Sequence, residues 1–169
     1  MFEEIRKAAI SAALDIFESM FFVFLEPIDG NLPSKEALSE PAEESDLIPP
    51  CAHPWIIKSQ IHFSGNHSGL LRLFIPYGLG ETLTMNFLGF EEEVTESQIE
   101  DTVGELANMV CGNLFSFLDK TSVYKLSTPL TQKISLQERM ERGEPSDLTL
   151  DFQTEEQQIT IQLQFEKLP

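Results

Sequence analysis

The feature that most limits the possible folds of this chain is a change in the spacing of its hydrophobic residues. In residues 2–20, and again from about 95 to 120, hydrophobic side chains recur every three or four positions, which predicts amphipathic helices. In residues 148–152 and 159–165 they alternate with polar residues, which predicts β-strands with one buried face. A chain of this kind is expected to fold as α+β, with long helices packed on a largely antiparallel β-sheet.

The regions between these segments predict shorter elements. Residues 56–75 have the pattern of a β-hairpin, because two alternating runs flank the turn-forming residues 65–69. Residues 78–88 predict a short helix that ends at Gly89. The aromatic run 21–25 predicts a short strand. The order of elements, with helices between groups of strands, again indicates an α+β fold.

One segment departs from this regular pattern. Residues 27–54 contain six prolines and many acidic residues, and they show no sustained hydrophobic periodicity. Such a segment can bury little apolar surface, so we interpret it as an acidic, proline-rich loop inserted in one domain. We therefore expect residues 1–169 to form a single domain, a length that suits one hydrophobic core.

The chain is strongly acidic, with a formal net charge of −17 from 11 basic and 28 acidic side chains. Nucleic acids and anionic membranes attract Lys and Arg, so this charge argues against both as partners. No hydrophobic run is long enough to cross a bilayer, and the amino terminus lacks the basic start of a signal peptide. Cys51 and Cys111 lie far apart in unlike surroundings, which favours a reducing compartment. We expect a cytoplasmic protein with a protein or small-molecule partner.

The predicted helix between 95 and about 120 has two different faces. Thr95 and Gln98 have the spacing of a capping box, which places the start of the helix. One face is hydrophobic and is expected to contact the core: Ile99, Val103, Leu106, Val110, Leu114 and Phe117. The opposite face carries Asp101, Glu105, Asn108 and Gly112. Packing in the core explains the first set and not the second.

This second face has two possible interpretations. Asn is a mediocre helix former, and each of the interior glycines 104 and 112 costs about 0.5–1 kcal/mol relative to Ala. The face is either a solvated surface with glycines needed for internal packing, or a surface that another molecule approaches closely. Periodicity alone favours the solvated surface, since most exposed helix faces do nothing specific.

The order of residues on this face resembles a known signature. Asp101-x3-Glu105-x2-Asn108, followed by Pro129 after a strand, is similar to the active-site signature of the CheC, CheX and FliY chemotaxis phosphatases. The wider segment 104–113 resembles the active helix of CheX proteins, and Glu18-Ser-Met-Phe-Phe22 resembles their amino-terminal segment. One copy of the signature is present where CheC carries two, so the resemblance is nearer to CheX.

The resemblance implies a phosphatase that acts on the aspartyl phosphate of a CheY-like response regulator. The chain would need no cofactor of its own, because the phosphorylated aspartate and its Mg²⁺ belong to the partner. Asn108 would hold a water in line with phosphorus, and Glu105 would pair with a lysine beside the phosphorylated site. An amide suits this task because it orients water without bringing negative charge to the phosphoryl group. A spacing of three lets both side chains reach one cavity.

The resemblance also implies contacts around this pair. Asp101, Gly104 and Gly112 would contact the partner, with the glycines allowing its loops to approach the helix. CheX proteins form homodimers, so a homodimer is expected, and an edge strand near 157–165 is one candidate for the contact.

Other interpretations of the sequence remain open. A docking module with the same fold, related to flagellar switch proteins, would bind a regulator without hydrolysing its phosphate. A domain of another two-component pathway would keep the chemistry and change the partner. We expect no metal site, because Cys51, His53, His62 and His67 do not have the spacing of zinc ligands.

Overall fold

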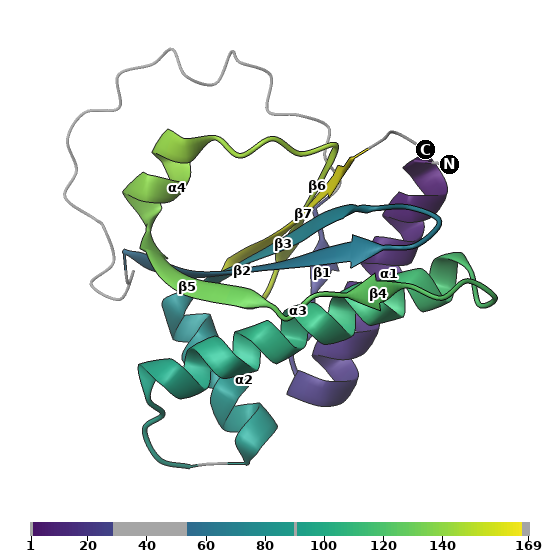
Figure 1. Ribbon diagram of the computed structural model, residues 1–169. Helices are drawn as coiled ribbons and strands as arrows, with labels where there is room; N and C mark the ends of the chain where they lie inside the picture. Colours follow the sequence, from purple (N-terminus) through teal and green to yellow (C-terminus); the bar gives the residue numbers. More distant parts are fainter. Residues whose placement is uncertain (1, 29–53, 90, 167–169) are drawn as a thin grey trace.

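The computed structural model describes residues 2–28, 54–89 and 91–166, and it shows an α+β fold (Figure 1). Most of the acidic loop predicted at 27–54 lies outside the described residues. The elements in chain order are α1 (Phe2–Phe21), β1 (Glu26–Pro27), β2 (Trp55–Ser64), β3 (Gly69–Pro76), α2 (Tyr77–Leu88), α3 (Glu96–Leu118), β4 (Lys125–Leu126), β5 (Leu130–Ser135), α4 (Leu136–Arg142), β6 (Leu148–Gln153) and β7 (Gln158–Phe165).

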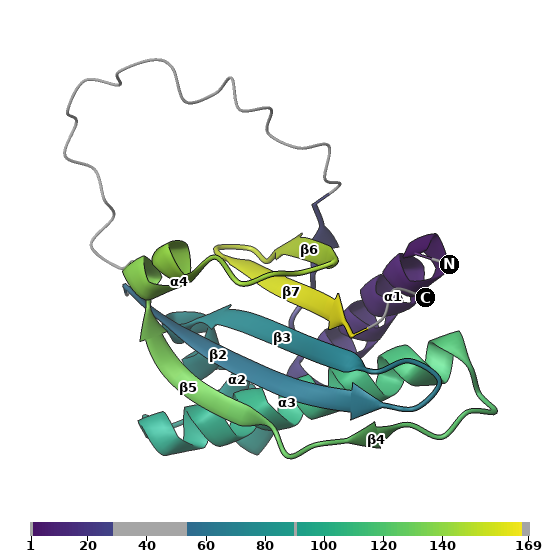
Figure 2. The same ribbon diagram turned by 45° about the horizontal axis from the view of Figure 1, so that its top comes forward.

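The strands of the described ranges form one antiparallel sheet of seven strands. Its order is β1-β6-β7-β3-β2-β4, with β5 also paired to β2. The predicted hairpin is confirmed as β2 and β3, in which Ile57 pairs with Ile75. The predicted terminal pair is confirmed as β6 and β7, in which Leu150 pairs with Ile161. Figure 2 shows these strands side by side.

Three helices cover one face of this sheet, and α4 lies on the other face (Figures 1 and 2). The alternation of side chains along the strands decides this arrangement, because every second residue points to the same face. On β2, for example, Ile57 and Ile61 are fully buried in the main core, where they meet helix α3. No helix in the described ranges is long and hydrophobic enough to span a membrane.

The boundaries of α2 and α3 follow from local capping chemistry, as predicted. Thr95 accepts a hydrogen bond from the backbone N–H of Gln98, and the Gln98 side chain accepts one from the Thr95 N–H. This capping box satisfies N–H groups that the first turn of α3 would otherwise leave without partners. Helix α2 ends at Gly89, whose φ of 68° lies in the left-handed region that glycine adopts at little cost.

Some elements differ from the sequence predictions. The run 21–25 is not a strand: α1 continues to Phe21, and the adjacent strand is the two-residue β1. Helix α4 was not predicted, because seven residues with no buried side chain give no hydrophobic periodicity. Strand β7 lies between β6 and β3, so the expectation of a dimer edge at 157–165 is wrong.

The face of the sheet under α4 holds a cluster of opposite charges. Lys58 on β2 and Arg72 on β3 are almost fully buried there, and both contact the carboxylate of Glu144. The Arg72 Nε atom lies 3.2 Å from the carboxylate, which also accepts a hydrogen bond from Lys58 Nζ. Buried cations are costly unless an acid compensates them, so Glu144 ties the segment after α4 to the sheet.

We predict that Glu144→Gln lowers the free energy of unfolding by about 3 kcal/mol, because it leaves two buried cations without an anion. Urea denaturation monitored by circular dichroism measures this change. The control is Glu141→Gln on α4, where the carboxylate is exposed and the expected change is below about 0.5 kcal/mol. A loss below about 1 kcal/mol in Glu144→Gln would show that water reaches and solvates the two cations.

Candidate functional site

One side of α3 remains open to solvent. Its exposed and half-buried residues follow a spacing of three and four that matches the turns of the helix: Ser97, Asp101, Glu105, Asn108, Gly112 and Ser116. We call this set the open face of α3. Asp101 and Glu105 are exposed, whereas Asn108 and Gly112 are half-buried. The structure therefore brings together on one face the four residues that the sequence placed opposite the core.

The remaining sides of α3 are covered. The helix packs against α1, α2 and the strands β2 and β5. Ten of its residues are buried, and they include Thr102, Gly104, Ala107 and Cys111, which lie outside the predicted hydrophobic face. Phe117 was expected in the core but is 50% exposed, and Phe115 is buried in its place. The middle of α3, from Asp101 to Gly112, is therefore accessible to a partner mainly through the open face.

Glu105 and Asn108 have no side-chain hydrogen bond or ion pair with any described residue. The Asn108 amide can donate two hydrogen bonds and accept two, and a carboxylate at 105 accepts only. Asn113, on another side of the same helix, is different because its Nδ2 donates to Asp15 Oδ2 on α1 at 2.9 Å. The pair thus presents unused donors and acceptors to whatever approaches the open face.

Gly104 lies directly under β5. A Cβ at this position would be 3.0 Å from Thr131 Oγ1 and 3.6 Å from Pro129 Cβ. The Thr131 hydroxyl also hydrogen-bonds with that of Ser59 on β2, at 2.8 Å. The close approach predicted at Gly104 is therefore made by the chain's own β5, and it gives an internal reason for glycine there. Pro129, the last member of the signature, contacts the helix one residue before Glu105.

Gly112 has a different environment. The nearest atom to a Cβ placed there, apart from the helix itself, would be Leu126 Cδ1 at 3.9 Å. Nothing inside the described protein therefore requires glycine at this position. Because Gly112 has no side chain, the open face has a shallow depression beside Asn108.

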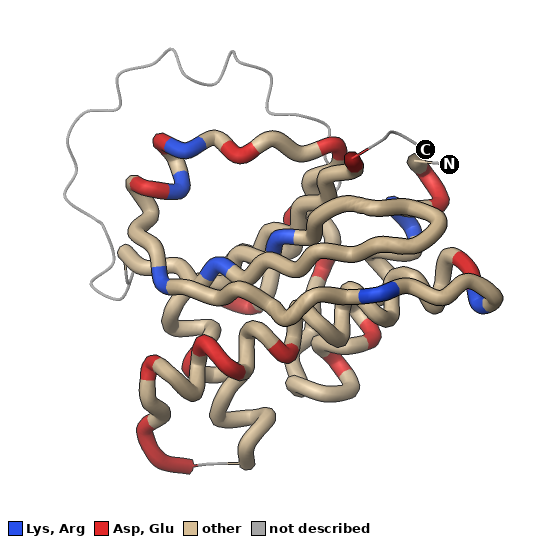
Figure 3. The backbone as a smooth tube through the Cα atoms, viewed as in Figure 1, with Lys and Arg blue, Asp and Glu red and all other residues tan. Residues whose placement is uncertain are grey.

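Glu105 borders a hollow of about 330 Å³ between α2 and α3. Its walls are Phe87, Leu88, Gln98, Asp101, Thr102 and Glu105. No Lys or Arg is among them, and α3 itself has only acidic charged residues. Figure 3 shows red positions along this part of the chain, whereas blue positions gather on α4 and the strands. The hollow has a hydrophobic wall and an acidic wall, which suits a cationic or amphipathic group.

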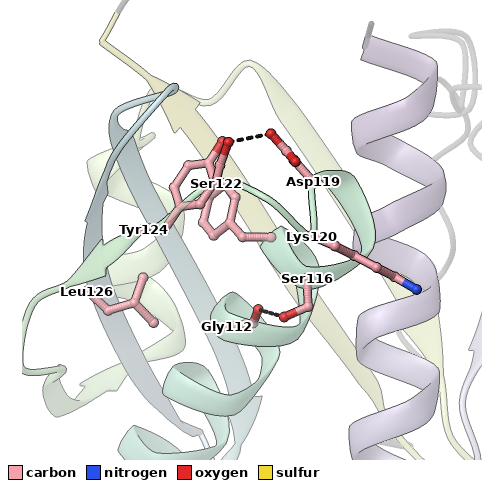
Figure 4. Close-up of a pocket in the computed structure, with 8 residues that line it drawn as sticks. Gly112, Ser116, Asp119, Lys120, Ser122, Tyr124 and Leu126 are labelled. Atoms are coloured by element: carbon pink, nitrogen blue, oxygen red, sulfur yellow. Dashed lines mark hydrogen bonds between the residues drawn. The ribbon is translucent and has the colours of Figure 1, made fainter.

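A larger hollow, of about 420 Å³, lies at the other end of the open face (Figure 4). It begins at Gly112 and Ser116 and continues to Asp119, Ser122 and Tyr124. Hydrogen bonds from Ser122 and Thr121 lower the pKa of Asp119 to about 2. The sequence did not indicate this hollow, because its residues come from a turn with no regular spacing.

Cys111 is the one cysteine on α3, and its side chain is fully buried. Burial raises the pKa of its thiol to about 12, since the thiolate is poorly solvated there. A thiol in this state is not a nucleophile at neutral pH. The helix is therefore not built for a covalent phosphocysteine intermediate.

Other candidate ligands and bases contribute no cluster to this face. Cys51 and His53 lie outside the described residues, and His62 is on β2. Across the described ranges, no group of three or more His, Cys, Asp and Glu side chains is placed to hold a metal ion. The side chains that the open face offers are thus an amide, carboxylates and hydroxyl groups.

Solved structures with the same fold are chemotaxis proteins. A CheC-like protein from Shewanella sp. PV-4 has a TM-score of 0.68 at 21% identity, over 99% of this chain and 100% of the other. A CheX protein from Desulfovibrio desulfuricans has a TM-score of 0.67 at 16% identity, over 96% and 99%. The CheX of a CheX–CheY–BeF3–Mg²⁺ complex from Borrelia burgdorferi has a TM-score of 0.64 at 12% identity, over 96% and 97%.

The arrangement of the sheet and helices is therefore that of the CheC/CheX-like fold. Residues 57–162, more than half of the chain, match the family described as chemotaxis phosphatase CheX. The chain belongs to this family, as the resemblance in sequence indicated. No protein of curated function matches the sequence.

We predict that Cys111 in the folded protein resists alkylation by iodoacetamide at pH 8, because its thiol is buried and protonated. Mass spectrometry of tryptic peptides measures the modified fraction at this residue. The same treatment in 6 M guanidinium chloride, which exposes the thiol, is the control and should modify it fully. Rapid alkylation of Cys111 in the native protein would contradict the assignment of a closed core around α3.

Proposed function

We propose that this chain hydrolyses the aspartyl phosphate of a CheY-like response regulator, with Asn108 positioning the attacking water. The observation that carries this proposal is the state of Glu105 and Asn108. Both lie on the open side of α3, three residues apart, and neither uses its side chain within the described protein. An unpaired, half-buried amide contributes little to the stability of the fold, whereas an amide that positions water must keep its hydrogen-bonding groups free.

The choice of partner is supported by the relative from Borrelia burgdorferi, which is in complex with CheY, beryllofluoride and Mg²⁺. Beryllofluoride stands in for a phosphoryl group. The membership of this chain in the chemotaxis phosphatase family points in the same direction. In the proposal the Mg²⁺ ion is bound by the regulator and supplies charge neutralisation at the phosphoryl oxygens.

The steps that remain for this chain concern position. Phosphoryl transfer requires a nucleophile in line with the leaving oxygen more than it requires covalent help. The Asn108 carbonyl oxygen would accept a hydrogen bond from the water, and its N–H2 group would face the reacting phosphoryl group. Glu105 would pair with the regulator's lysine, which fixes the regulator on the helix. Asp101, beside it in the hollow, would add negative charge to the same contact.

The surrounding residues fit such a docked partner. Gly112 leaves the helix low next to Asn108, so a loop of the regulator can approach the backbone. Gly104 has its own contact with β5, and we assign it no direct contact with the partner. We keep the homodimer that the family resemblance implies, and a cytoplasmic location, as parts of this proposal. With β7 inside the sheet, the outer strands of the described sheet are β1 on one side, beside the part of β6 that extends beyond it, and β4 and β5 on the other.

We predict that Asn108→Ala lowers the rate of hydrolysis of a phosphorylated CheY-like regulator by about a hundredfold or more, because the water is no longer held in line. The measurement is the decay of radiolabelled phosphate on the regulator. Asn113→Ala is the matched control, since this asparagine lies on the same helix and hydrogen-bonds to α1. It should retain the activity of the unmodified chain.

Two results would contradict this assignment. Full activity in Asn108→Ala, with an unchanged circular dichroism spectrum, would remove the amide from the mechanism. Binding of the regulator without any acceleration by the unmodified chain would instead establish the non-catalytic docking module.

We predict that Glu105→Gln weakens the binding of a beryllofluoride-activated regulator by about tenfold, because a charge-assisted contact to its lysine is lost. Isothermal titration calorimetry measures the dissociation constant. The difference between the two proteins should shrink as salt is raised, since salt screens the charge. Glu141→Gln, on the opposite face of the sheet, is the control. Equal affinities for Glu105→Gln and the unmodified chain would remove Glu105 from the interface.

A further inference from the structure

The end of α1 has an unusual residue at its capping position. The helix ends at Phe21, and Phe22 follows with a φ of 57°, in the left-handed region. The backbone N–H of Val23 donates to the carbonyl of Phe17 at 3.0 Å. This hydrogen bond closes the end of α1 with one residue more than the bond of a Schellman cap, which would reach the carbonyl of Glu18. A left-handed residue that follows a helix is most often glycine, because a side chain there is strained. Of the non-glycine residues in the described ranges, Phe22 alone has a positive φ.

The side chain of Phe22 gives no packing contribution that would offset this strain. It is 70% exposed, and its ring makes no aromatic contact in the described part of the chain, whereas Phe21 beside it is fully buried. A large exposed ring on a strained backbone is unfavourable on both counts for folding. Strain of this kind is retained at sites that contact a ligand or a partner more often than elsewhere.

Phe22 directly follows a residue that packs against one wall of the candidate site. The ring of Phe21 stacks on Phe87 with centroids 5.0 Å apart, and the Phe21 carbonyl accepts a hydrogen bond from Asn86 Nδ2 at 2.8 Å. Phe87 and Leu88 form the hydrophobic wall of the hollow that Asp101 and Glu105 close on the other side. Phe22 is therefore one residue away from the residue that supports this wall. Met20, Phe24 and Leu88 are also exposed hydrophobic residues in this region.

We propose that Phe22 is a hydrophobic anchor for the response regulator, which would seat its phosphorylated face on the open face of α3 and over the hollow next to it. The inference rests on the proposed function and adds a contact outside the signature residues. It also names the complementary surface: a hydrophobic depression on the regulator, near the lysine that Glu105 would engage. Aromatic anchors beside a charged contact are typical of the residues that dominate binding energy.

The charge around Phe22 favours this occupant over two others. Glu18 and Glu26 are exposed near it in the chain, and the hollow has no basic residue in its lining, so an anionic membrane would be repelled. A second copy joined by a two-fold axis would place the same acidic hollow against itself, which is unfavourable for like charges. A regulator that presents a lysine and a metal ion compensates these acids.

The variant Phe22→Gly tests strain and binding separately. Relief of strain would raise the stability of the fold, whereas loss of the ring would lower the affinity for the regulator. Glycine adopts a φ of 57° without strain, so the melting temperature should stay unchanged or rise by about 2–4 °C. At the same time the KM for the phosphorylated regulator should rise about tenfold or more, with kcat within about twofold of the unmodified chain. Calorimetry with the beryllofluoride-activated regulator should show the same loss of affinity.

Two further variants make this result specific. Phe22→Asn also suits the left-handed conformation, and it should lose affinity as Phe22→Gly does. Met140→Ala removes a hydrophobic side chain that is 77% exposed on α4, across the sheet, and should bind the regulator as the unmodified chain does. An equal loss of affinity in Met140→Ala and Phe22→Gly would contradict the role of Phe22 as an anchor, because any exposed hydrophobic residue would then contribute to binding.

The remaining outcomes distinguish this inference from the proposed function. If Phe22→Gly keeps the KM of the unmodified chain while Asn108→Ala loses kcat, the anchor is wrong and the phosphatase stands. If Phe22→Gly instead lowers the mass measured by light scattering and leaves the KM unchanged, a second copy is the occupant, which also overturns the inference. If the unmodified chain neither binds nor dephosphorylates any of a panel of regulators, both proposals fail together.

Discussion

The packing of α3 between α1, α2 and the sheet determines where the candidate chemistry lies. The helix buries ten residues, and the open face is the row of exposed and half-buried residues that runs along its length. The row carries Glu105 and Asn108 because their spacing of three matches the helical turn. A loop could present the same side chains, but a helix held by a core on three sides keeps their separation constant. Positioning a water molecule depends on such constancy.

The signature residues have unequal roles in this arrangement. Pro129 and Gly104 lie against each other, and they set how closely β5 crosses the helix next to Glu105. Glu105 and Asn108 follow this contact on the same helix, one and four residues after Gly104, and they keep their hydrogen-bonding groups free. The signature therefore contains both a packing contact, between Gly104 and Pro129, and the functional pair that begins at the next residue, Glu105. A larger residue at position 104 would displace β5 or the helix. It would therefore also displace Glu105 and Asn108, although it would contact neither of their side chains.

The sequence was sufficient for the elements whose signals are local. The capping box at Thr95, the cap at Gly89 and the alternation of β6 and β7 each depend on a few neighbouring residues, and each was predicted. The sequence was insufficient where the outcome depends on distant parts of the chain. Phe115 rather than Phe117 is buried because its ring packs on Phe63 and Tyr124, with centroids 4.7 Å and 3.9 Å away, and both partners come from outside α3. The burial of Gly104 similarly depends on β5, which lies 25 residues or more away in the chain.

The distribution of charge explains why an amide occupies the central position of the open face. The charged residues of α3 are all acidic, and two of the described cations, Lys58 and Arg72, are buried on the opposite side of the sheet, where Glu144 neutralises them. A phosphoryl group that approaches α3 thus meets a negative surface, and a third carboxylate at 108 would add to the repulsion. Asparagine offers a donor and an acceptor without charge. In the proposed function, cations brought by the partner would compensate the acids beside Asn108, which would favour a metal-loaded, lysine-bearing phosphoprotein over a free phosphate ester.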